Sequence, residues 1–335
     1  MQINALAAHQ KGESLKPYSF DAGEVQNYDC LIKVLACGIC HSDLHVIDND
    51  WGNSRYPVVP GHEVIGEVVE LGSQVGHLKV GDRIGVGWQM SSCLQCPDCL
   101  KGNENLCDEN KFLITDGYGG FADYLKIDSR FAFPIPAGIA TEFAGPLLCG
   151  GITVYSALRH AGMSSGQEIG VIGIGGLGHL AVQFASKLGN KVTVFTTSQD
   201  KADFATQLGA SHVVVVPPGQ SPPAPTRLLD IIISTVPQSL DWAAYLEYLN
   251  SDGTFTMVGV PNDPINLPLW SLLTKRRRFM ASPIGGRAMI IEMLSVADRF
   301  GIKPIVETFP LQQVNEAMQR VRDNKVRYRA VLTIA

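Results

Sequence analysis

The sequence lacks a surplus of positive charge. It has 27 lysine and arginine residues against 32 aspartate and glutamate residues, which gives a formal net charge of −5 at pH 7. Nucleic acids and anionic membrane surfaces both need a concentrated positive field on a protein that binds them. The composition therefore argues against both kinds of partner. We interpret the one basic run, residues 276–278, as a solvated helix end or a subunit contact.

Long apolar runs are also missing. No segment contains the roughly 18 consecutive apolar residues that indicate a membrane-spanning helix. The N-terminus, MQINALAAHQKGES, lacks the charged start, apolar stretch and cleavage site of a secretory signal. We therefore expect a cytoplasmic protein with no membrane segment. In such a chain, eight cysteines are more typical of metal ligands and core positions than of a disulfide framework.

The 335-residue chain is long for a single hydrophobic core, so we expect more than one domain. In residues 1–146, short β-rich runs alternate with glycine, proline and aspartate turns, and helical periodicity is scarce. This pattern predicts a β-barrel-like domain. Its expected strands are residues 30–36, 63–71, 83–86 and 121–127.

Residues 147–288 alternate between strand and helix patterns. We expect strands at 168–172, 191–195, 212–216, 228–234 and 254–260, and helices at 179–188, 201–208 and 240–249. Parallel neighbours need crossover connections, so the alternation predicts an α/β domain with a doubly wound parallel sheet. The proline-rich segment 217–227 cannot be helical and should cross the surface.

Residues 289–335 form a third segment. An amphipathic helix, with apolar residues at Val314, Ala317, Met318 and Val321, precedes an expected strand at 328–333. This strand could return to complete the first domain.

Four cysteines lie close together in a polar, turn-rich loop, at about residues 91–109. Cys93, Cys96, Cys99 and Cys107 follow the pattern C-x2-C-x2-C-x7-C. Four thiolates at this spacing can close a tetrahedral shell around Zn²⁺ and leave no open position, which indicates a structural zinc site. An iron–sulfur cluster would use similar ligands, but the Cys–Pro ending of the ferredoxin-type run is absent. A redox dithiol would need only two of the four.

The segment VIGIGGLGH, residues 171–179, contains a G-x-G-x-x-G motif between an expected strand and an expected helix. Gly173 would permit the tight turn, Gly175 the approach of a pyrophosphate, and Gly178 the packing of helix on strand. The phosphates would lie at the N-terminus of the helix. This context favours a dinucleotide site over a turn without a ligand.

The choice between NAD and NADP depends on the end of the next strand, VFTTSQDK. Thr196, Thr197 and Ser198 are neutral hydroxyl donors and Lys201 adds a positive charge, which suits a 2′-phosphate. Asp200 could instead bind the ribose 2′-hydroxyl of NAD, but it lies past the strand end and fits the start of a helix better. We therefore favour NADP.

A second zinc site, a catalytic one, would need about three protein ligands and one open position. Cys40 in GICHSDLH, His62 and Glu63 in PVVPGHEVIG, and Cys149 in PLLCGGITVY are the candidates. With these motifs the chain resembles the zinc-dependent medium-chain alcohol dehydrogenases. It is closest in pattern to their cinnamyl alcohol dehydrogenase-like branch of NADP-dependent aldehyde reductases. GICHSDLH, PGHE, the four-cysteine loop, PLLCGGIT, GIGGLGH, FTTSxxK and VRYRAVL occur in the order of that family over nearly the whole chain.

The resemblance implies a GroES-like β-barrel catalytic domain, a Rossmann domain and an active site in the cleft between them. Two zinc ions per chain are implied. Cys40, His62 and Cys149 would bind the catalytic ion with Glu63 as an alternating ligand, and Cys93, Cys96, Cys99 and Cys107 would bind the structural ion.

The family pattern also implies roles for the other residues of GICHSDLH. Ser42 would hydrogen-bond the substrate oxygen, and His45 would end a proton relay that runs through the cofactor ribose. Asp43 would orient His62, and His41 would lie near the cofactor pyrophosphate. Further cofactor contacts are implied at Thr153, Gly176 and Leu177.

The same resemblance places Trp51, Trp88, Pro283 and Ile284 along the substrate pocket, so an apolar or aromatic aldehyde would fit best. Two departures from the family pattern are the short segment 108–118, which suggests a more open pocket, and the proline-rich segment 217–227. We expect a homodimer through the Rossmann domain, and a tetramer is possible.

The expected activity is reversible hydride transfer between NADPH and an aldehyde. One alternative is an NAD-dependent polyol or secondary-alcohol dehydrogenase. Another, from a different class, is a non-catalytic relative that binds nucleotide, which would be expected to have lost zinc ligands. We interpret Cys30 and Cys37 as core residues, and His9, His77, His160 and His212 as turn or core residues.

Overall fold

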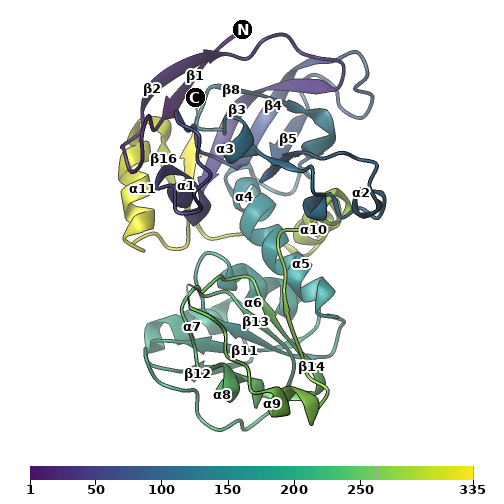
Figure 1. Ribbon diagram of the computed structural model, residues 1–335, viewed down its shortest axis with the longest axis vertical. Helices are drawn as coiled ribbons and strands as arrows, with labels where there is room; N and C mark the ends of the chain where they lie inside the picture. Colours follow the sequence, from purple (N-terminus) through teal and green to yellow (C-terminus); the bar gives the residue numbers. More distant parts are fainter. Residues whose placement is uncertain (262, 335) are drawn as a thin grey trace. The chain divides into compact units, whose positions relative to one another are not determined.

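The computed structural model describes residues 1–261 and 263–334 (Figure 1). The chain divides into two compact units. Unit 1 comprises Met1–Cys149 together with the described residues from Gly286 onward, and unit 2 comprises Gly150–Gly285. Within the described residues, no helix is both long enough and apolar enough to cross a membrane.

Unit 1 is built on a mainly antiparallel sheet. Its strands follow the order β16 (Val306–Pro310), β17 (Arg329–Thr333), β3 (Asp29–Ile39), β4 (Glu63–Leu71), β5 (Arg83–Val86) and β9 (Ala132–Pro134), and β8 (Tyr124–Asp128) also pairs with β3. The last strand, β17, lies between β16 and β3, so the C-terminal segment completes the sheet, as expected. The core includes Cys30 and Cys37, which are fully buried.

Two short ribbons extend unit 1. β1 (Gln2–Ala7) pairs with β2 (Lys16–Asp21), and β6 (Gln89–Ser91) pairs with β7 (Lys111–Phe112) at the base of the four-cysteine loop. Residues 2–7 alternate between exposed and buried side chains, because one face of β1 packs on the core. Neither ribbon was predicted.

The helices of unit 1 are mostly short. They are α1 (His41–Ile47), α2 (Pro97–Leu100), α3 (Leu113–Asp116), α4 (Thr141–Pro146), α10 (Arg287–Phe300) and α11 (Val314–Arg322), with 3₁₀ turns at Glu104–Leu106, Ser129–Phe131 and Leu311–Gln313. Helix α11 buries the four predicted residues, Val314, Ala317, Met318 and Val321. Helix α10 was not predicted.

Unit 2 contains a six-stranded parallel sheet (Figure 1). Its strand order is β12 (His212–Val215), β11 (Lys191–Thr196), β10 (Glu168–Ile172), β13 (Leu229–Ser234), β14 (Leu249–Met257) and β15 (Arg278–Ala281). Its helices are α5 (Ile152–His160), α6 (Gly178–Lys187), α7 (Gln199–Gln207), α8 (Trp242–Leu246) and α9 (Leu269–Leu273). From β10 the chain winds to one edge of the sheet through β11 and β12, and it then returns to wind to the other edge through β13, β14 and β15. This is the doubly wound order that the sequence predicted.

Two expectations for unit 2 were wrong in part. The predicted helix at 240–249 is only α8, because the chain turns into β14 at Leu249. The basic run 276–278, expected to be a solvated helix end or a subunit contact, is only partly solvated: Arg276 and Arg278 are exposed and Arg277 is not. Arg277 is buried and donates hydrogen bonds from Nε and Nη2 to the carbonyl of Leu249, at 3.0 and 2.7 Å. Arg277 therefore anchors the chain between α9 and β15.

Candidate functional site

Three segments of unit 1 bring four metal-ligand candidates together. Cys40 follows β3, His62 and Glu63 lie at the start of β4, and Cys149 lies in a π-helical turn, Leu147–Gly151. One donor atom from each lies within 4.8 Å of the others. The Sγ atoms of Cys40 and Cys149 are 3.9 Å apart, and the Sγ of Cys149 is 3.2 Å from Nε2 of His62. These are the residues that the sequence suggested for a catalytic zinc.

The donor set and its spacing fit zinc. Zinc binds thiolate sulfur at about 2.3 Å in tetrahedral geometry, which places two bound sulfurs about 3.8 Å apart. The observed separation of Cys40 and Cys149 is close to this value. Two thiolates and one neutral imidazole would balance the charge of a divalent ion and leave a fourth position.

Asp43 fixes the geometry of this cluster from behind. Its side chain is fully buried in the first turn of α1. Its carboxylate accepts hydrogen bonds from the backbone N–H groups of Cys40 and Gly61, both at 2.8 Å, and lies 3.1 Å from Nδ1 of His62. Because Asp43 engages Nδ1, the opposite ring nitrogen, Nε2, faces the thiols.

The electrostatics of the cluster favour a bound cation. A hydrogen bond with Cys149 lowers the pKa of the Cys40 thiol well below its usual range, against the opposing effect of burial. Burial by itself would lower the pKa of His62, but the charge and hydrogen bond of Asp43 raise it well above its usual range. The lowered pKa of Cys40 favours its thiolate, which is the form of cysteine that binds a metal cation.

Glu63 combines a ligand position with a buried ion pair. The carboxylate is fully buried, and its Oε1 accepts a hydrogen bond from Nη2 of Arg329 in β17. Burial raises the pKa of Glu63, and the positive charge of Arg329 opposes that shift. Oε2 is buried without a hydrogen-bond partner among the described residues, and a Cβ at position 38 would overlap it. The absence of a side chain at Gly38 therefore leaves room for Oε2 of Glu63, and this unpaired oxygen is available to bind a cation.

The remaining polar residues of GICHSDLH lie on α1. The Oγ of Ser42 is 3.7 Å from the Sγ of Cys40. His45 is partly exposed, and its Nδ1 is 2.8 Å from Oδ2 of Asp50. The ring of His41 lies 6.5 Å from the ring of His45. Asp50 was not predicted, because it lies beyond the end of α1 and its contact depends on how the chain turns there.

Aromatic side chains border the metal-ligand candidates. The ring of Trp88 lies 5.0 Å from the ring of His62 and perpendicular to it. Trp51, 5.7 Å from Trp88, is 47% exposed, so the row runs from the surface to the cluster. Phe112, whose ring is 5.3 Å from that of Trp88, extends the row and was not predicted. These faces offer an apolar, aromatic wall to a substrate.

The four-cysteine loop forms a second compact donor cluster. The sulfur atoms of Cys93, Cys96, Cys99 and Cys107 all lie within 4.8 Å of one another. Cys93 is 3.9 Å from Cys99 and 3.5 Å from Cys107. Backbone N–H groups of Gln95 and Cys96 lower the pKa of Cys93 to about 7, which favours the thiolate that a metal needs. Four sulfur donors fit a closed, structural zinc site.

In unit 2, the predicted glycine motif forms the turn between β10 and α6. Gly173 has a positive φ of 88°, and a Cβ at Gly178 would overlap the carbonyl oxygen of Gly173. Nothing lies within 4 Å of the Cβ position of Gly175. Gly176 and Leu177 complete the turn, with Leu177 as the N-cap of α6. The turn thus exposes backbone at the carboxyl end of β10, where a pyrophosphate binds in this kind of sheet.

The candidate selectivity residues follow β11. Thr196 is buried at the end of the strand, whereas Thr197 and Lys201 are exposed and Ser198 is the N-cap of α7. Asp200 lies in the first turn of α7, and a hydrogen bond with Ser198 lowers its pKa.

Three further predicted contact residues also belong to unit 2. Thr153 lies in α5, and Pro283 and Ile284 lie between β15 and α10. The four metal-ligand candidates belong to unit 1.

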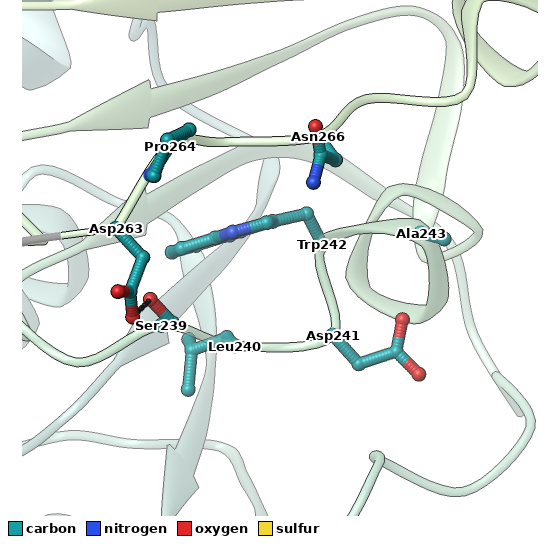
Figure 2. A pocket seen from close by; sticks show the side chains of 8 residues that line it. All are labelled: Ser239, Leu240, Asp241, Trp242, Ala243, Asp263, Pro264 and Asn266. Atoms are coloured by element: carbon teal, nitrogen blue, oxygen red, sulfur yellow. Dashed lines mark hydrogen bonds between the residues drawn. The ribbon is translucent and has the colours of Figure 1, made fainter.

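Unit 2 also has a cavity of about 280 Å³ beside α8. Figure 2 shows the indole of Trp242 between Ser239 and Asp241 on one side and Pro264 on the other. The Oγ of Ser239 donates to Asp263 at 2.8 Å, and Asp241 accepts from the N–H of Ala244 at 3.1 Å as the N-cap of α8. Both carboxylates thus stabilise the local loops.

Comparisons with known proteins agree with this geometry. Residues 26–137 match the alcohol dehydrogenase GroES-like domain, and residues 176–299 match the zinc-binding dehydrogenase domain. The chain is 43% identical over 331 residues to an aldehyde reductase, AdhA, from Synechocystis, covering 99% of this chain and 98% of that protein.

Two solved structures are similar over almost the whole chain. A cinnamyl alcohol dehydrogenase from Sorghum bicolor has a TM-score of 0.91 and 37% identity, with 99% of this chain and 98% of that chain covered. The CAD of Helicobacter pylori, solved as a complex with NADP(H), has a TM-score of 0.91 and 31% identity, with the same coverage of both chains.

Proposed function

The chain belongs to the zinc-dependent alcohol dehydrogenase family and interconverts alcohols and aldehydes, and we propose that it does so as an NADP(H)-dependent reductase of apolar or aromatic aldehydes. The observation that carries the proposal is the cluster of Cys40, His62, Glu63 and Cys149 beside an aromatic wall. Both donor clusters have every predicted ligand, which argues against a non-catalytic relative.

We propose that Cys40, His62 and Cys149 hold a catalytic zinc ion, with Glu63 as an alternating ligand, and that the four-cysteine loop holds a structural one. When bound, the catalytic ion would supply a Lewis acid that polarises the aldehyde carbonyl. Asp43 keeps Nε2 of His62 directed at that position by engaging Nδ1. Trp88 and Trp51 would line the aromatic side of the substrate.

Proton transfer falls to residues of α1. The hydroxyl of Ser42, next to Cys40, would give its proton to the nascent alcohol oxygen and be replenished from His45. Oδ2 of Asp50 lies 2.8 Å from Nδ1 of His45 and fixes the orientation of its ring. Both His45 and Asp50 are partly exposed, so bulk solvent can restore the proton.

Residues after β11 support the preference for NADP(H). Exposed Thr197 and Lys201, with Ser198 between them, offer hydroxyl and ammonium donors to a 2′-phosphate. The carboxylate of Asp200 forms a hydrogen bond with Ser198, so it is not left free to bind the ribose 2′-hydroxyl of NAD. The Helicobacter pylori relative carries NADP(H), and its likeness to this chain agrees with the assignment.

Self-association through unit 2 is a further part of the proposal. Strand β15 is the edge of the described sheet and pairs with β14 alone. Just before it, α9 exposes Leu269, Trp270 and Leu273, at 70%, 74% and 59%. An apolar surface beside an open strand edge suits a second copy of the chain.

We expect a homodimer. Trp270→Glu should convert this dimer to a monomer in sedimentation experiments. An unchanged mass in the variant, or a wild-type protein that is already a monomer, would contradict the proposed interface.

We also propose a cytoplasmic location. All eight cysteines are free thiols, and two clusters of thiols persist most readily in a reducing compartment. The small-molecule substrate would be the main partner.

A kinetic panel tests the proposed activity. Aliphatic, aromatic and polyol-derived substrates would be assayed with NADPH and NADH, with Cys40→Ala as the control that lacks one zinc ligand. Aromatic aldehydes with NADPH should give the highest kcat/KM. A preference for NADH with polyols would replace the proposal with the polyol dehydrogenase alternative, and retained activity of Cys40→Ala would remove the ligand assignment.

A further inference from the structure

The four-cysteine loop contacts the start of α10 through one buried side chain. Glu104, in the 3₁₀ turn Glu104–Leu106, is only 4% exposed. Its Oε2 accepts a hydrogen bond from the backbone N–H of Arg287, the first residue of α10, at 3.0 Å. Its Oε1 lies 3.3 Å from Nη1 of the same arginine. One carboxylate therefore binds both the backbone and the side chain of a residue 183 positions away.

Helix α10 has no capping side chain of its own. Its N-cap is Gly286, and the first N–H groups of a helix need acceptors from elsewhere. A carboxylate at this position also interacts favourably with the positive end of the helix dipole. Glu104 therefore acts as the cap of α10, although it belongs to the cysteine loop.

The position of Glu104 depends on the cysteines on each side of it. The N–H of Cys107 donates to the carbonyl of Glu104 at 3.1 Å, and the N–H of Gly102 donates to the carbonyl of Cys99 at 3.0 Å. Outside the loop, Nε2 of Gln89 donates to the same carbonyl of Glu104 at 2.6 Å. Because the loop has little apolar core, a metal bound to its sulfurs would hold Glu104 in place.

The other partner, Arg287, is fixed on its far side. Its Nε donates to the carbonyl of Arg130 at 2.6 Å, and its guanidinium lies 5.4 Å from the centre of the Phe131 ring. The backbones also approach closely here, since a Cβ at Gly286 would overlap the carbonyl oxygen of Gly102. These contacts leave the start of α10 little freedom while the loop is intact.

We propose that the four-cysteine loop is a metal-dependent clamp on the start of α10, with Glu104 and Arg287 as positioning residues. The chain passes from unit 2 into unit 1 at Gly285–Gly286. Pro283 and Ile284, which we propose as substrate contacts, directly precede this point. The clamp would thus fix the chain next to these two proposed substrate contacts, and this consequence rests on the proposed function.

The coupling has to be reciprocal. If the metal holds Glu104 against Arg287, then Arg287 must help to hold the metal. Arg287→Ala, far from the cysteines in sequence, should weaken the affinity of the loop for zinc, measured by equilibrium competition with a colorimetric chelator, by about five- to tenfold, at the lower end of typical coupling. Glu104→Ala should do the same. Repeating the assay in a Cys40→Ala background, which lacks a catalytic-site ligand, assigns the released zinc to the loop.

Arg320→Ala is a matched control within unit 1. Arg320 also pairs with a glutamate, Glu307, at 2.6 Å, and its guanidinium also lies 5.4 Å from a phenylalanine ring. Its loss should leave zinc affinity unchanged. Glu104→Gln and Arg287→Lys, which keep an acceptor and a cation respectively, should recover part of the wild-type zinc affinity even where the alanine variants fold poorly.

The selectivity consequence has its own readout. In both alanine variants, KM for a bulky aromatic aldehyde should rise several-fold while kcat changes less than twofold, because the reacting groups are untouched. Equal zinc affinity in Arg287→Ala, Glu104→Ala and wild type would overturn the clamp. A protein without activity on any aldehyde would instead overturn the proposed function, because zinc affinity is measured without substrate.

Discussion

Replacing Asp43 with asparagine should weaken the proposed catalytic zinc site without affecting the cysteine loop. All three partners of the Asp43 carboxylate are nitrogen atoms: the backbone N–H groups of Cys40 and Gly61, and Nδ1 of His62. The asparagine amide has only one acceptor oxygen, so its NH₂ group must face a donor in either orientation. One hydrogen bond to a charged group is lost at least, which costs about 1.5–3 kcal/mol.

The loss acts on His62, because the contact with Asp43 directs its Nε2. Removing such a supporting contact typically lowers metal affinity by about 10- to 100-fold, or about 1.4–2.7 kcal/mol. Chelator competition should therefore show one zinc per chain released at lower chelator concentration than in the wild type, and the second zinc unchanged. Asp50→Asn is the matched control, since it also removes a carboxylate from a histidine, at 2.8 Å, but not from a proposed ligand. Wild-type zinc affinity in Asp43→Asn, or an equal loss in Asp50→Asn, would refute the reasoning.

Three further outcomes are expected. Lys201→Glu should weaken NADPH binding about 10- to 100-fold, the equivalent of one hydrogen bond to a charged group, with little effect on NADH; equal effects in fluorescence titrations would remove the 2′-phosphate assignment. Ser42→Ala should lower kcat by about 10²- to 10⁴-fold, typical of a lost proton donor, while metal analysis still finds two zinc ions per chain. Burial raises the pKa of Tyr245 to about 12, whereas an unfolded tyrosine titrates near about 10. The unfolded chain therefore releases this proton first, and the free energy of unfolding should fall as pH rises from about 10 to 12. Tyr245→Phe should show a smaller fall in urea unfolding; an identical fall would assign the effect to other groups.

Much of the fold was predictable, because it follows from local periodicity and turn residues. The predicted fold class, a GroES-like domain with a Rossmann sheet, is confirmed. Strands Glu63–Leu71, Arg83–Val86 and Glu168–Ile172 have the predicted bounds. Helix α10 was missed although Ile290, Met293, Leu294 and Ala297 have helical spacing and are buried. The helix expected at 240–249 failed because the sheet takes over at Leu249.

The residues of the candidate site were predictable where a short sequence motif contains the metal-ligand side chains. The four sulfurs of the cysteine loop meet because the loop is short. Cys40 and His62 meet because β3 and β4 pair from Gly38 and Glu63 onward, and Cys149 joins them because it follows α4, which packs on both strands. The supporting partners were not predictable in this way. Arg329 contacts Glu63 across 266 positions, and the sequence offers only one hint of a buried partner, an arginine that begins a mostly apolar strand, RAVLT.

The place of β17 in its sheet also bears on how the protein is made. A ribosome completes unit 2 as one continuous stretch, Gly150–Gly285, which can fold while synthesis continues. Unit 1 has to wait, because β17 supplies the neighbour of β3 and the cation that pairs with Glu63. Until then, Cys40 and Cys149 belong to an incomplete unit 1. We therefore expect the proposed catalytic zinc to bind only after β17 has emerged from the ribosome.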